Sequence, residues 1–347
     1  MPSKLVRVHS ESPKQDLWIY FRRFEVIDSV QARTKDGLRA NAEAVRHCVR
    51  QARDYFASAS AASLMTRPVL LYYGMVTLAK LLLLVDHLRP LGIDDIEELE
   101  RNGGHGLKQR DPDNASSGPY HLEAGSVIVT AGDRKGGGRL GRGIFPQLAD
   151  RICPKHGETW LDQQVPLFDL LRAIPQLDLL MREGFGDRAG FSGLWVPRFD
   201  RGYVEIRVSD TATIAVNEVQ GRIAYLDSER YSVRQPSRAD SQLYALDVAE
   251  EEQDELLSRE EFSEHDHVLP ATLLGDRLEG LLAQYMVMYA LSIVARYKPH
   301  RWAEILQGET GVLPILEKLM TVAERWWPNL VLNRLTSSAV LFAPTMY

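Results

Sequence analysis

Two long apolar runs dominate the pattern of the chain, one toward each end. The first, RPVLLYYGMVTLAKLLLLVD, occupies residues 67–86, and the second, LLAQYMVMYALSIVARY, occupies residues 281–297. As a helix, the second run is apolar nearly all round and must be buried on every side. Neither run can bury its surface alone, so the pattern predicts that the two helices pack against each other.

A second helix pattern precedes the first apolar run. Over residues 36–62, apolar or small side chains recur every three to four positions, which predicts a long amphipathic helix. Thr66 is the expected cap of the helix from Pro68 to about Leu88, because proline is well tolerated at a first helical position. The short link between these helices favours an antiparallel hairpin.

The middle of the chain has a different pattern of hydrophobic and polar residues. Residues 126–130, SVIVT, predict a strand, and residues 165–174 and 177–182 predict short helices that Pro175 interrupts. From 202 to 248 apolar and polar residues alternate, which predicts a small antiparallel sheet.

The last part of the chain returns to helical patterns. Residues 312–327 predict a helix that Pro328 ends, and a further helix is expected to start at Asn329. Three tryptophans belong to this region, and we expect them in the core with a partly exposed rim, an interface anchor being the alternative: Trp302, Trp326 and Trp327.

These elements predict an α+β fold that is mainly α. A helical bundle is expected from residues 1–98 and 269–347. Residues 99–268 are expected to form a mixed α/β insert with glycine-rich loops and a small antiparallel sheet.

Composition narrows the class of protein. The 347 residues are 45% hydrophobic and 25% charged, as in ordinary globular proteins with a sizeable core. A formal net charge of -6 argues against a protein that coats nucleic acid through its overall field, while a local basic patch stays open. Two cysteines, Cys48 and Cys153, favour a reducing compartment, although one disulfide between them stays open.

The sequence also bears on location. Lys80 lies inside the first apolar run, and a lysine near mid-membrane is costly, so a buried core helix is expected there rather than a membrane span. The start of the sequence has no apolar secretory segment. We therefore expect a cytoplasmic protein without membrane association.

Several segments together resemble the YaaC-like family of bacterial proteins, in the same order and over roughly residues 15–335. The family has little assigned chemistry, so the resemblance implies a fold more than an activity. The segments that carry it are Tyr55-Phe56 with RPVLLYYG from Arg67 to Gly74 and then Leu78-Ala79-Lys80, His105-Gly106-Leu107, PLFDLL from Pro166 to Leu171 with Ile174-Pro175, and ARYKPHRW from Ala295 to Trp302.

The first helical pair also resembles the start of a HEPN-type bundle. Many HEPN proteins are ribonucleases whose motif joins an arginine to a histidine across four to six residues. Here Arg296 and His300 are separated by three residues, and Pro299 stands where the helix would continue. Such an arginine could stabilise developing phosphate charge while the histidine transfers a proton. The alternative is that Arg296 compensates a helix C-terminus.

Two glycine-rich segments are further candidates. His105 lies in the loop RNGGHG and could bind an anion with Lys108 nearby, whereas a hydrogen bond within the turn is the structural alternative. Residues 132–143 lack the spacing of a P-loop and could be a simple mobile loop. Their basic side chains could instead contact a nucleotide or a nucleic-acid backbone: Arg134, Lys135, Arg139 and Arg142.

No metal or cofactor is predicted. The segments EHDH at 264–267 and CPKH at 153–156 contain ligand types without a matching second cluster. Neither a G-x-S-x-G elbow nor a G-x-G-x-x-G turn occurs in the sequence.

Two functional hypotheses of different classes follow. One is a regulatory or partner-binding module in bacterial stress response or phage defence, which binds a protein partner or a second copy through the helical bundle. The other is an enzyme that acts on RNA or a nucleotide, with Arg296, His300 and His105 as catalytic candidates.

Overall fold

The computed structural model describes residues 5–86, 89–112, 121–130, 143–153, 161–186, 194–200, 203–207, 232–234, 243–247, 267–269, 271–273, 276–308 and 312–344. Two compact units make up the chain. One is formed by residues 171–283 and the other by residues 2–170 together with 284–347.

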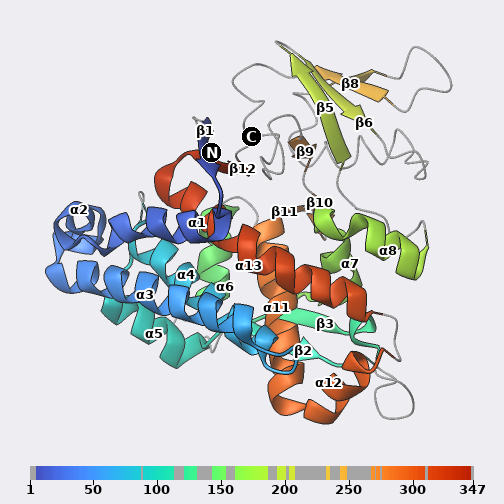
Figure 1. Cartoon of the computed structure of the whole chain (residues 1–347), viewed down its shortest axis with the longest axis horizontal. Helices are drawn as coiled ribbons and strands as arrows, with labels where there is room; N and C mark the ends of the chain where they lie inside the picture. The colour runs from blue at the N-terminus through green and yellow to red at the C-terminus, as the bar shows by residue number, and fades with distance from the viewer. Residues whose placement is uncertain are drawn as a thin grey trace. The chain divides into compact units, whose positions relative to one another are not determined.

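An antiparallel helical hairpin forms the centre of the second unit (Figure 1). It consists of α3, Arg39–Ala61, and α4, Arg67–Leu84, which pack along their length as predicted. A Cβ atom on Gly74 would lie 2.7 Å from the Phe56 ring, so the missing side chain allows the close approach of the two helices. Thr66 occupies the N-cap position of α4, as expected, but its hydroxyl makes no capping hydrogen bond within the described structure.

Helix α4 is the core helix that its composition predicts. Among the described residues it is the one helix long and apolar enough to cross a membrane, and two thirds of it are buried inside the protein. Lys80 reaches Glu100 of α5, Ile93–Gly103, at 2.5 Å, so its charge has a protein partner. Burial against protein accounts for the apolar composition of α4.

The second apolar run forms α11, Gly280–Tyr297. Tyr72 of α4 contacts Tyr285 and Tyr289 of α11, each with ring centroids 5.5 Å apart. Tyr285 also contacts Trp327 of α13, Leu313–Thr336. The two apolar runs therefore pack together, as the sequence predicts.

One predicted break in the C-terminal region is wrong. Pro328 does not end a helix, because α13 continues through it to Thr336. Trp327 and Val331 on either side are fully buried. A proline removes one backbone hydrogen bond from a helix, and burial of its neighbours offsets that loss here. Trp302 is likewise fully buried, whereas Trp326 is partly exposed, which confirms the predicted core with a rim.

The two ends of this unit are joined by a parallel strand pair that the sequence analysis did not predict. Strand β1, Leu5–Ser10, runs beside β12, Ala339–Pro344 (Figure 1). Helix α1, Pro13–Phe21, follows β1 and packs on α13. Short helical turns then lead to α3: η1 Arg22–Glu25, α2 Ile27–Val30, η2 Gln31–Arg33 and η3 Lys35–Gly37.

A three-stranded antiparallel sheet completes the unit. Its order is β2–β3–β4, and β3 at Ser126–Val129 confirms the predicted strand. Val165 belongs to β4 rather than to a helix, and α7 begins two residues later. The other elements here are β2 Leu107–Arg110, η4 Leu122–Ala124, α6 Ile144–Ile152, β4 Gln164–Pro166, α7 Leu167–Arg172 and α12 Pro299–Leu306.

The unit of residues 171–283 contains the small antiparallel sheet that the alternating pattern predicts. Its order is β7–β8–β6–β5–β9, and a separate hairpin joins β10 and β11. Within the predicted sheet region of 202–248, the alternating segments 211–219 and 222–227 lie outside the described residues. The elements of this unit are η7 Pro175–Leu177, α8 Asp178–Phe185, β5 Leu194–Asp200, β6 Tyr203–Arg207, β7 Ser232–Arg234, β8 Leu243–Asp247, β9 His267–Leu269, β10 Ala271–Leu273 and β11 Asp276–Leu278.

The fold is α+β and mainly α, as predicted. Cys48 and Cys153 are not joined by a disulfide, so the bond that the sequence left open does not form. The domain boundaries at 98 and 268 stay a prediction.

Candidate functional site

A cluster of aromatic and basic side chains joins α4, α11 and the loop after α5. We call it the Tyr–Arg cluster. It comprises Tyr72, Tyr73, His105, Tyr285, Tyr289 and Arg296.

Arg296 ties the C-terminal end of α11 to α4. Its Nη1 donates to the Tyr73 hydroxyl at 2.8 Å, while Nε donates to the Ser292 carbonyl at 3.1 Å and Nη2 to the Ser292 hydroxyl at 3.3 Å. The guanidinium lies over the rings of Tyr73 and Tyr297, 5.3 and 5.2 Å from their centroids. Each guanidinium nitrogen thus has a neutral acceptor within the protein.

His105 is held by backbone contacts as well as by ring contacts. Its ring packs against Tyr72 and Tyr289 at centroid distances of 5.3 and 6.0 Å. Its carbonyl accepts the backbone N–H of Phe145 at 3.0 Å. The backbone geometry explains why two positions at this loop are glycines. Gly104 has a positive φ of 54°, and a Cβ atom on Gly143 would lie 2.7 Å from the carbonyl oxygen of Gly103. The loop is therefore packed rather than open.

Burial sets the protonation of the cluster. Desolvation lowers the pKa of His105, and the positive charge of Arg296 lowers it further, so the imidazole is neutral at pH 7. Burial raises the pKa of the Tyr72 and Tyr289 phenols. Tyr289 donates to the Leu107 carbonyl at 2.7 Å. The hydroxyls of Tyr72 and Tyr285 influence each other, but within the described structure neither makes a hydrogen bond of normal geometry.

His300 does not join this cluster. Helix α11 ends at Tyr297, and α12 begins at Pro299, so Arg296 and His300 lie on different helices. The His300 side chain is exposed, and none of the contacts between described residues links it to Arg296 or His105. The structure places Arg296 within electrostatic reach of His105, and it places His300 on the next helix with its side chain exposed.

The predicted phosphate-binding residues are only partly described. Lys108 is exposed on β2, next to Leu107, whose carbonyl accepts the Tyr289 hydroxyl. The other four lie outside the described residues: Arg134, Lys135, Arg139 and Arg142.

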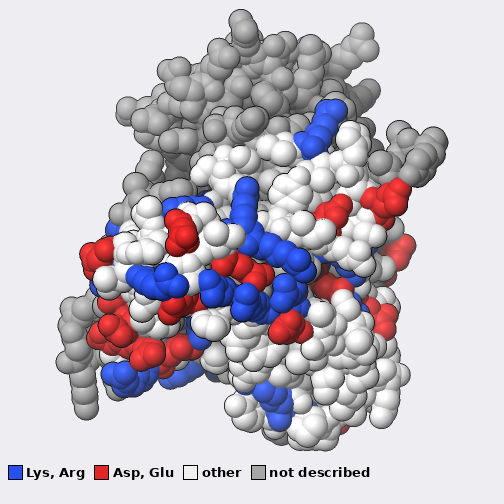
Figure 2. Space-filling model, turned by 60° about the vertical axis from the view of Figure 1, so that its left-hand side comes forward, with Lys and Arg blue, Asp and Glu red and all other residues white. Residues whose placement is uncertain are grey.

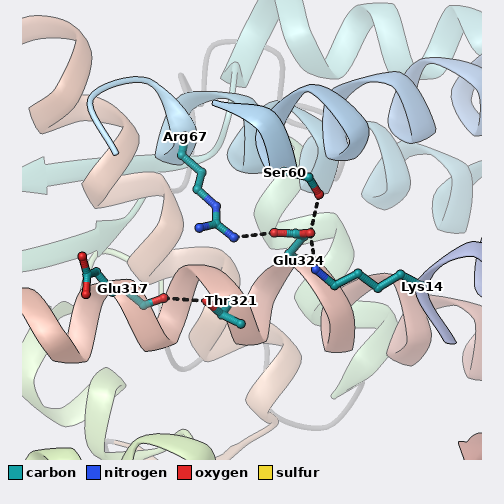
Figure 3. Close-up of polar contacts among 6 residues, drawn as sticks. All are labelled: Lys14, Ser60, Arg67, Glu317, Thr321 and Glu324. Carbon is teal, nitrogen blue, oxygen red and sulfur yellow. Dashed lines mark hydrogen bonds and ion pairs between the residues drawn. The ribbon is translucent and has the colours of Figure 1, made fainter. Parts of the chain in front are cut away.

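A second polar cluster, which the sequence analysis missed, surrounds Glu324 of α13 (Figure 3). We call it the Glu324 cluster. The carboxylate, with its side chain 3% exposed, accepts from Lys14 of α1 at 2.6 Å and also from Ser60 of α3 and Arg67 of α4. Burial acts to raise the pKa of Glu324, but the hydrogen bonds from its three partners outweigh burial and hold the pKa below its ordinary value.

A polar pocket of about 520 Å³ opens on α3 and α4. Its lining comes mainly from α3, with one side chain from α4: His47, Arg50, Gln51, Asp54, Tyr55, Ser58 and Leu70. The Tyr55 ring stacks on Tyr73 with centroids 5.8 Å apart, so the pocket wall touches the Tyr–Arg cluster.

Charge on the surface is interleaved. Figure 2 shows Lys and Arg side chains gathered in a band over one face, with Asp and Glu beside them. Arg50 and Arg53, for example, both approach Glu25, at 2.7 and 3.4 Å. Among the residues that the structure describes, no group of three or more His, Cys, Asp or Glu could hold a metal ion.

Comparison with known families shows a match to the YaaC-like protein family over residues 8–335. The chain belongs to this family. No curated protein and no solved structure matches it.

The segments by which the chain resembles the YaaC-like family supply both clusters of this YaaC-like protein. Segment 67–74 provides Arg67 to the Glu324 cluster and two tyrosines to the Tyr–Arg cluster. Segments 105–107 and 295–302 provide His105 and Arg296. Tyr285, Tyr289 and Glu324 were not predicted as site residues, since in sequence they read as parts of core helices.

Proposed function

We propose that this YaaC-like protein is a regulatory, partner-binding module of bacterial stress response or phage defence, and that a protein partner or a second copy binds to its helical bundle. The observation that carries the proposal is the state of Arg296. Its guanidinium nitrogens donate to Ser292 and Tyr73, so the side chain fastens α11 to α4. An arginine used in this way supports a rigid binding surface.

The placement of Arg296 and His300 on two different helices favours binding over catalysis. Cleavage of RNA by an arginine and a histidine requires both at one phosphate group. Arg296 and His300 lie on different helices, with Pro299 between them at the start of α12. His105 packs against two tyrosine rings, where a neutral imidazole serves as a packing group.

Tyr297 provides the contact surface for a partner. Its side chain is 68% exposed, the largest exposed fraction among the large apolar side chains that the structure describes. Arg296 lies over the ring and keeps its positive charge beside neutral acceptors. Aromatic and arginine side chains dominate interface hot spots. We therefore expect the partner to present an apolar pocket for the ring with an acidic group next to it.

A second candidate is an enzyme that acts on RNA or a nucleotide. The observation in its favour is the influence of Arg296 on the pKa of His105, which places the two within electrostatic reach. A neutral histidine beside an arginine has the chemistry of a general base next to a phosphate clamp. His300, Lys108 and the basic side chains of residues 132–143 would then contribute to substrate binding.

Complementation separates the two candidates. A strain that lacks the gene receives wild-type protein, Tyr297→Ala or His300→Ala at matched protein levels, and its survival of phage challenge and stress is measured. We expect His300→Ala to protect like wild type, and Tyr297→Ala to fail. Ile19→Ala, which removes another exposed apolar side chain, is the matched control. Loss of protection in His300→Ala with an unchanged unfolding midpoint would favour the enzyme.

A direct binding measurement complements the cellular test. Sedimentation of the purified chain over a range of concentrations reports whether a second copy binds. If the partner is a second copy, Tyr297→Ala weakens association about tenfold or more, as expected for a hot-spot residue, while Ile19→Ala leaves it unchanged. If the chain is monomeric at all concentrations, the proposed partner is a different protein and not a second copy.

A further inference from the structure

The pocket on α3 and α4 is an open hollow whose lining side chains are mostly exposed. Its volume of about 520 Å³ falls within the range of about 300–1,000 Å³ that small-molecule sites occupy. The lining residues of α3 recur at intervals of three and four, so they share one face of the helix. This face lies away from the buried side of α3, where Val49, Ala52 and Phe56 are located.

One end of the pocket presents an aromatic wall. The Tyr55 ring stacks on Tyr73 with an interplanar angle of 24°, and Tyr73 is fixed in turn by Arg296. Leu70 of α4 adds an apolar surface beside it. A ring held in place in this way loses little freedom when a planar group stacks on it, so this wall suits a flat aromatic ligand.

The middle of the pocket requires a ligand with hydrogen-bond donors. Asp54 contributes a carboxylate, which only accepts hydrogen bonds, and its ion pair with Arg53 is long, at 3.8 Å. Gln51 and Ser58 both donate and accept. A simple aromatic carboxylate has no donor for Asp54, whereas a sugar with adjacent hydroxyls has two.

The other end of the pocket carries the cation Arg50, with His47 one turn before it on α3. Glu25 shares the charge of Arg50, and Asp54 lies one turn after it. The Nε of Arg50 donates to Glu25 at 2.7 Å, which orients the guanidinium beside the pocket. A planar guanidinium that is already oriented is well suited to bind phosphate oxygens.

We propose that this pocket binds a nucleoside monophosphate. The base stacks on Tyr55 beside Leu70, the ribose hydroxyls donate to Asp54, and the phosphate binds Arg50 and His47. A sugar phosphate alone would leave the aromatic wall unused, and a nucleoside alone would leave Arg50 and His47 unused. The proposal stands apart from the partner-binding function, because it rests on a different surface.

Calorimetric titration of the full chain with adenosine, cytidine, guanosine and uridine monophosphates tests the proposal. We expect saturable binding of at least one of them. For that nucleotide, the nucleoside without phosphate should bind about tenfold more weakly, equivalent to about 1.4 kcal/mol. Ribose 5-phosphate should bind more weakly still. Absence of saturable binding for all four at millimolar concentration overturns the proposal.

Two matched pairs of variants locate the site. Ser58 is exposed and lines the pocket, so Ser58→Tyr should fill the pocket and abolish binding. Its neighbour Ala57 is exposed outside the pocket, so Ala57→Tyr should bind like wild type. Nucleotide binding that survives Ser58→Tyr excludes this pocket.

The second pair tests the position of the phosphate. Arg50→Gln should weaken nucleotide binding about tenfold, or about 1.4 kcal/mol, and leave nucleoside binding unchanged. Arg39→Gln also removes an exposed ion pair of α3, with Glu43 at 3.1 Å, and should leave both affinities unchanged. Equal weakening of nucleotide and nucleoside by Arg50→Gln would contradict the assigned orientation.

Discussion

The Glu324 cluster and the Tyr–Arg cluster both fasten other helices to α4, but they manage charge in opposite ways. Glu324 is a buried anion that meets two cations and a hydroxyl, so its charge is compensated inside the protein. Arg296 is a cation that donates to two neutral residues, Tyr73 and Ser292. The charge of Glu324 is therefore neutralised within its cluster, whereas the Tyr–Arg cluster keeps a net positive charge next to the exposed ring of Tyr297.

This difference separates a structural role from a role at the surface. A compensated buried anion offers nothing to a ligand, and its removal affects mainly stability. An uncompensated cation near an exposed aromatic ring remains able to attract an acidic group. The contrast therefore points to the Arg296–Tyr297 end of α11 for partner binding and to Glu324 for stability of the bundle.

The largest effect is expected from Glu324→Ala. Removing the carboxylate leaves the partly buried Arg67 without its anionic partner, which should lower the free energy of unfolding by about 3 kcal/mol, the lower end of the range for a broken buried ion pair. Glu317 is an exposed glutamate of the same helix, and Figure 3 shows its side chain directed away from the cluster. Glu317→Ala should change stability by only about 0.5 kcal/mol. Urea denaturation of both variants measures the difference. Equal losses in the free energy of unfolding would mean that the Glu324 cluster does not hold the helices together.

The next effect concerns α4 between the two clusters. Gly74→Ala places a methyl group 2.7 Å from the Phe56 ring, which should lower the free energy of unfolding by about 1–3 kcal/mol. Phe56→Leu makes room at this contact, so the double variant should lose less than the sum of the single losses. Strict additivity in urea denaturation would show that the two helices do not depend on this contact.

A smaller effect distinguishes two tyrosines of the Tyr–Arg cluster. Tyr289→Phe removes the hydrogen bond to the Leu107 carbonyl and should lower stability by about 1 kcal/mol. Tyr72→Phe removes a buried hydroxyl without a normal hydrogen bond in the described structure, so stability should stay the same or rise slightly. If Tyr72→Phe proved the more damaging change, the Tyr72 hydroxyl would have a partner that this account lacks.

The smallest effect is a difference in pH dependence. His105 has a lowered pKa in the folded state, so below its ordinary value of 6.5 the unfolded chain binds more protons and stability falls as pH falls. Glu324 also has a lowered pKa, and its contribution is lost as pH falls below about 4.5. His105→Gln should reduce the pH dependence of stability only in the range just below pH 6.5. Glu324→Gln should reduce it only in the range below about pH 4.5. Urea denaturation between pH 8 and pH 3 measures both effects. A contribution of His105 that makes the protein more stable as the pH falls from 6.5 to 5 would contradict the prediction.

The core helices could be predicted from the sequence because their signal is local. The apolar runs identify α4 and α11, and burial on all sides implies that they meet. The pairing of β1 with β12 could not be predicted, because it joins residues at opposite ends of the chain. The continuation of α13 through Pro328 depends on the burial of Trp327 and Val331, which no local rule contains.

The candidate sites divide in the same way. Arg296 and His105 could be predicted because one belongs to a motif and the other to a glycine-rich loop. The pairing of His300 with Arg296 requires that one helix holds both residues, and a new helix begins at Pro299. Glu324 resembles any other helix glutamate in sequence. Its partners lie 310, 264 and 257 positions away in the chain, so only the fold could identify them.

We propose that Arg296 fastens α11 to α4 and takes no part in RNA cleavage. The most direct test is incubation of purified wild-type protein and Arg296→Lys with a mixture of single-stranded and structured RNAs, followed by analysis of the products. We expect the same background level of product from both proteins. Cleavage by the wild type that Arg296→Lys abolishes, with an unchanged unfolding midpoint, would contradict this proposal.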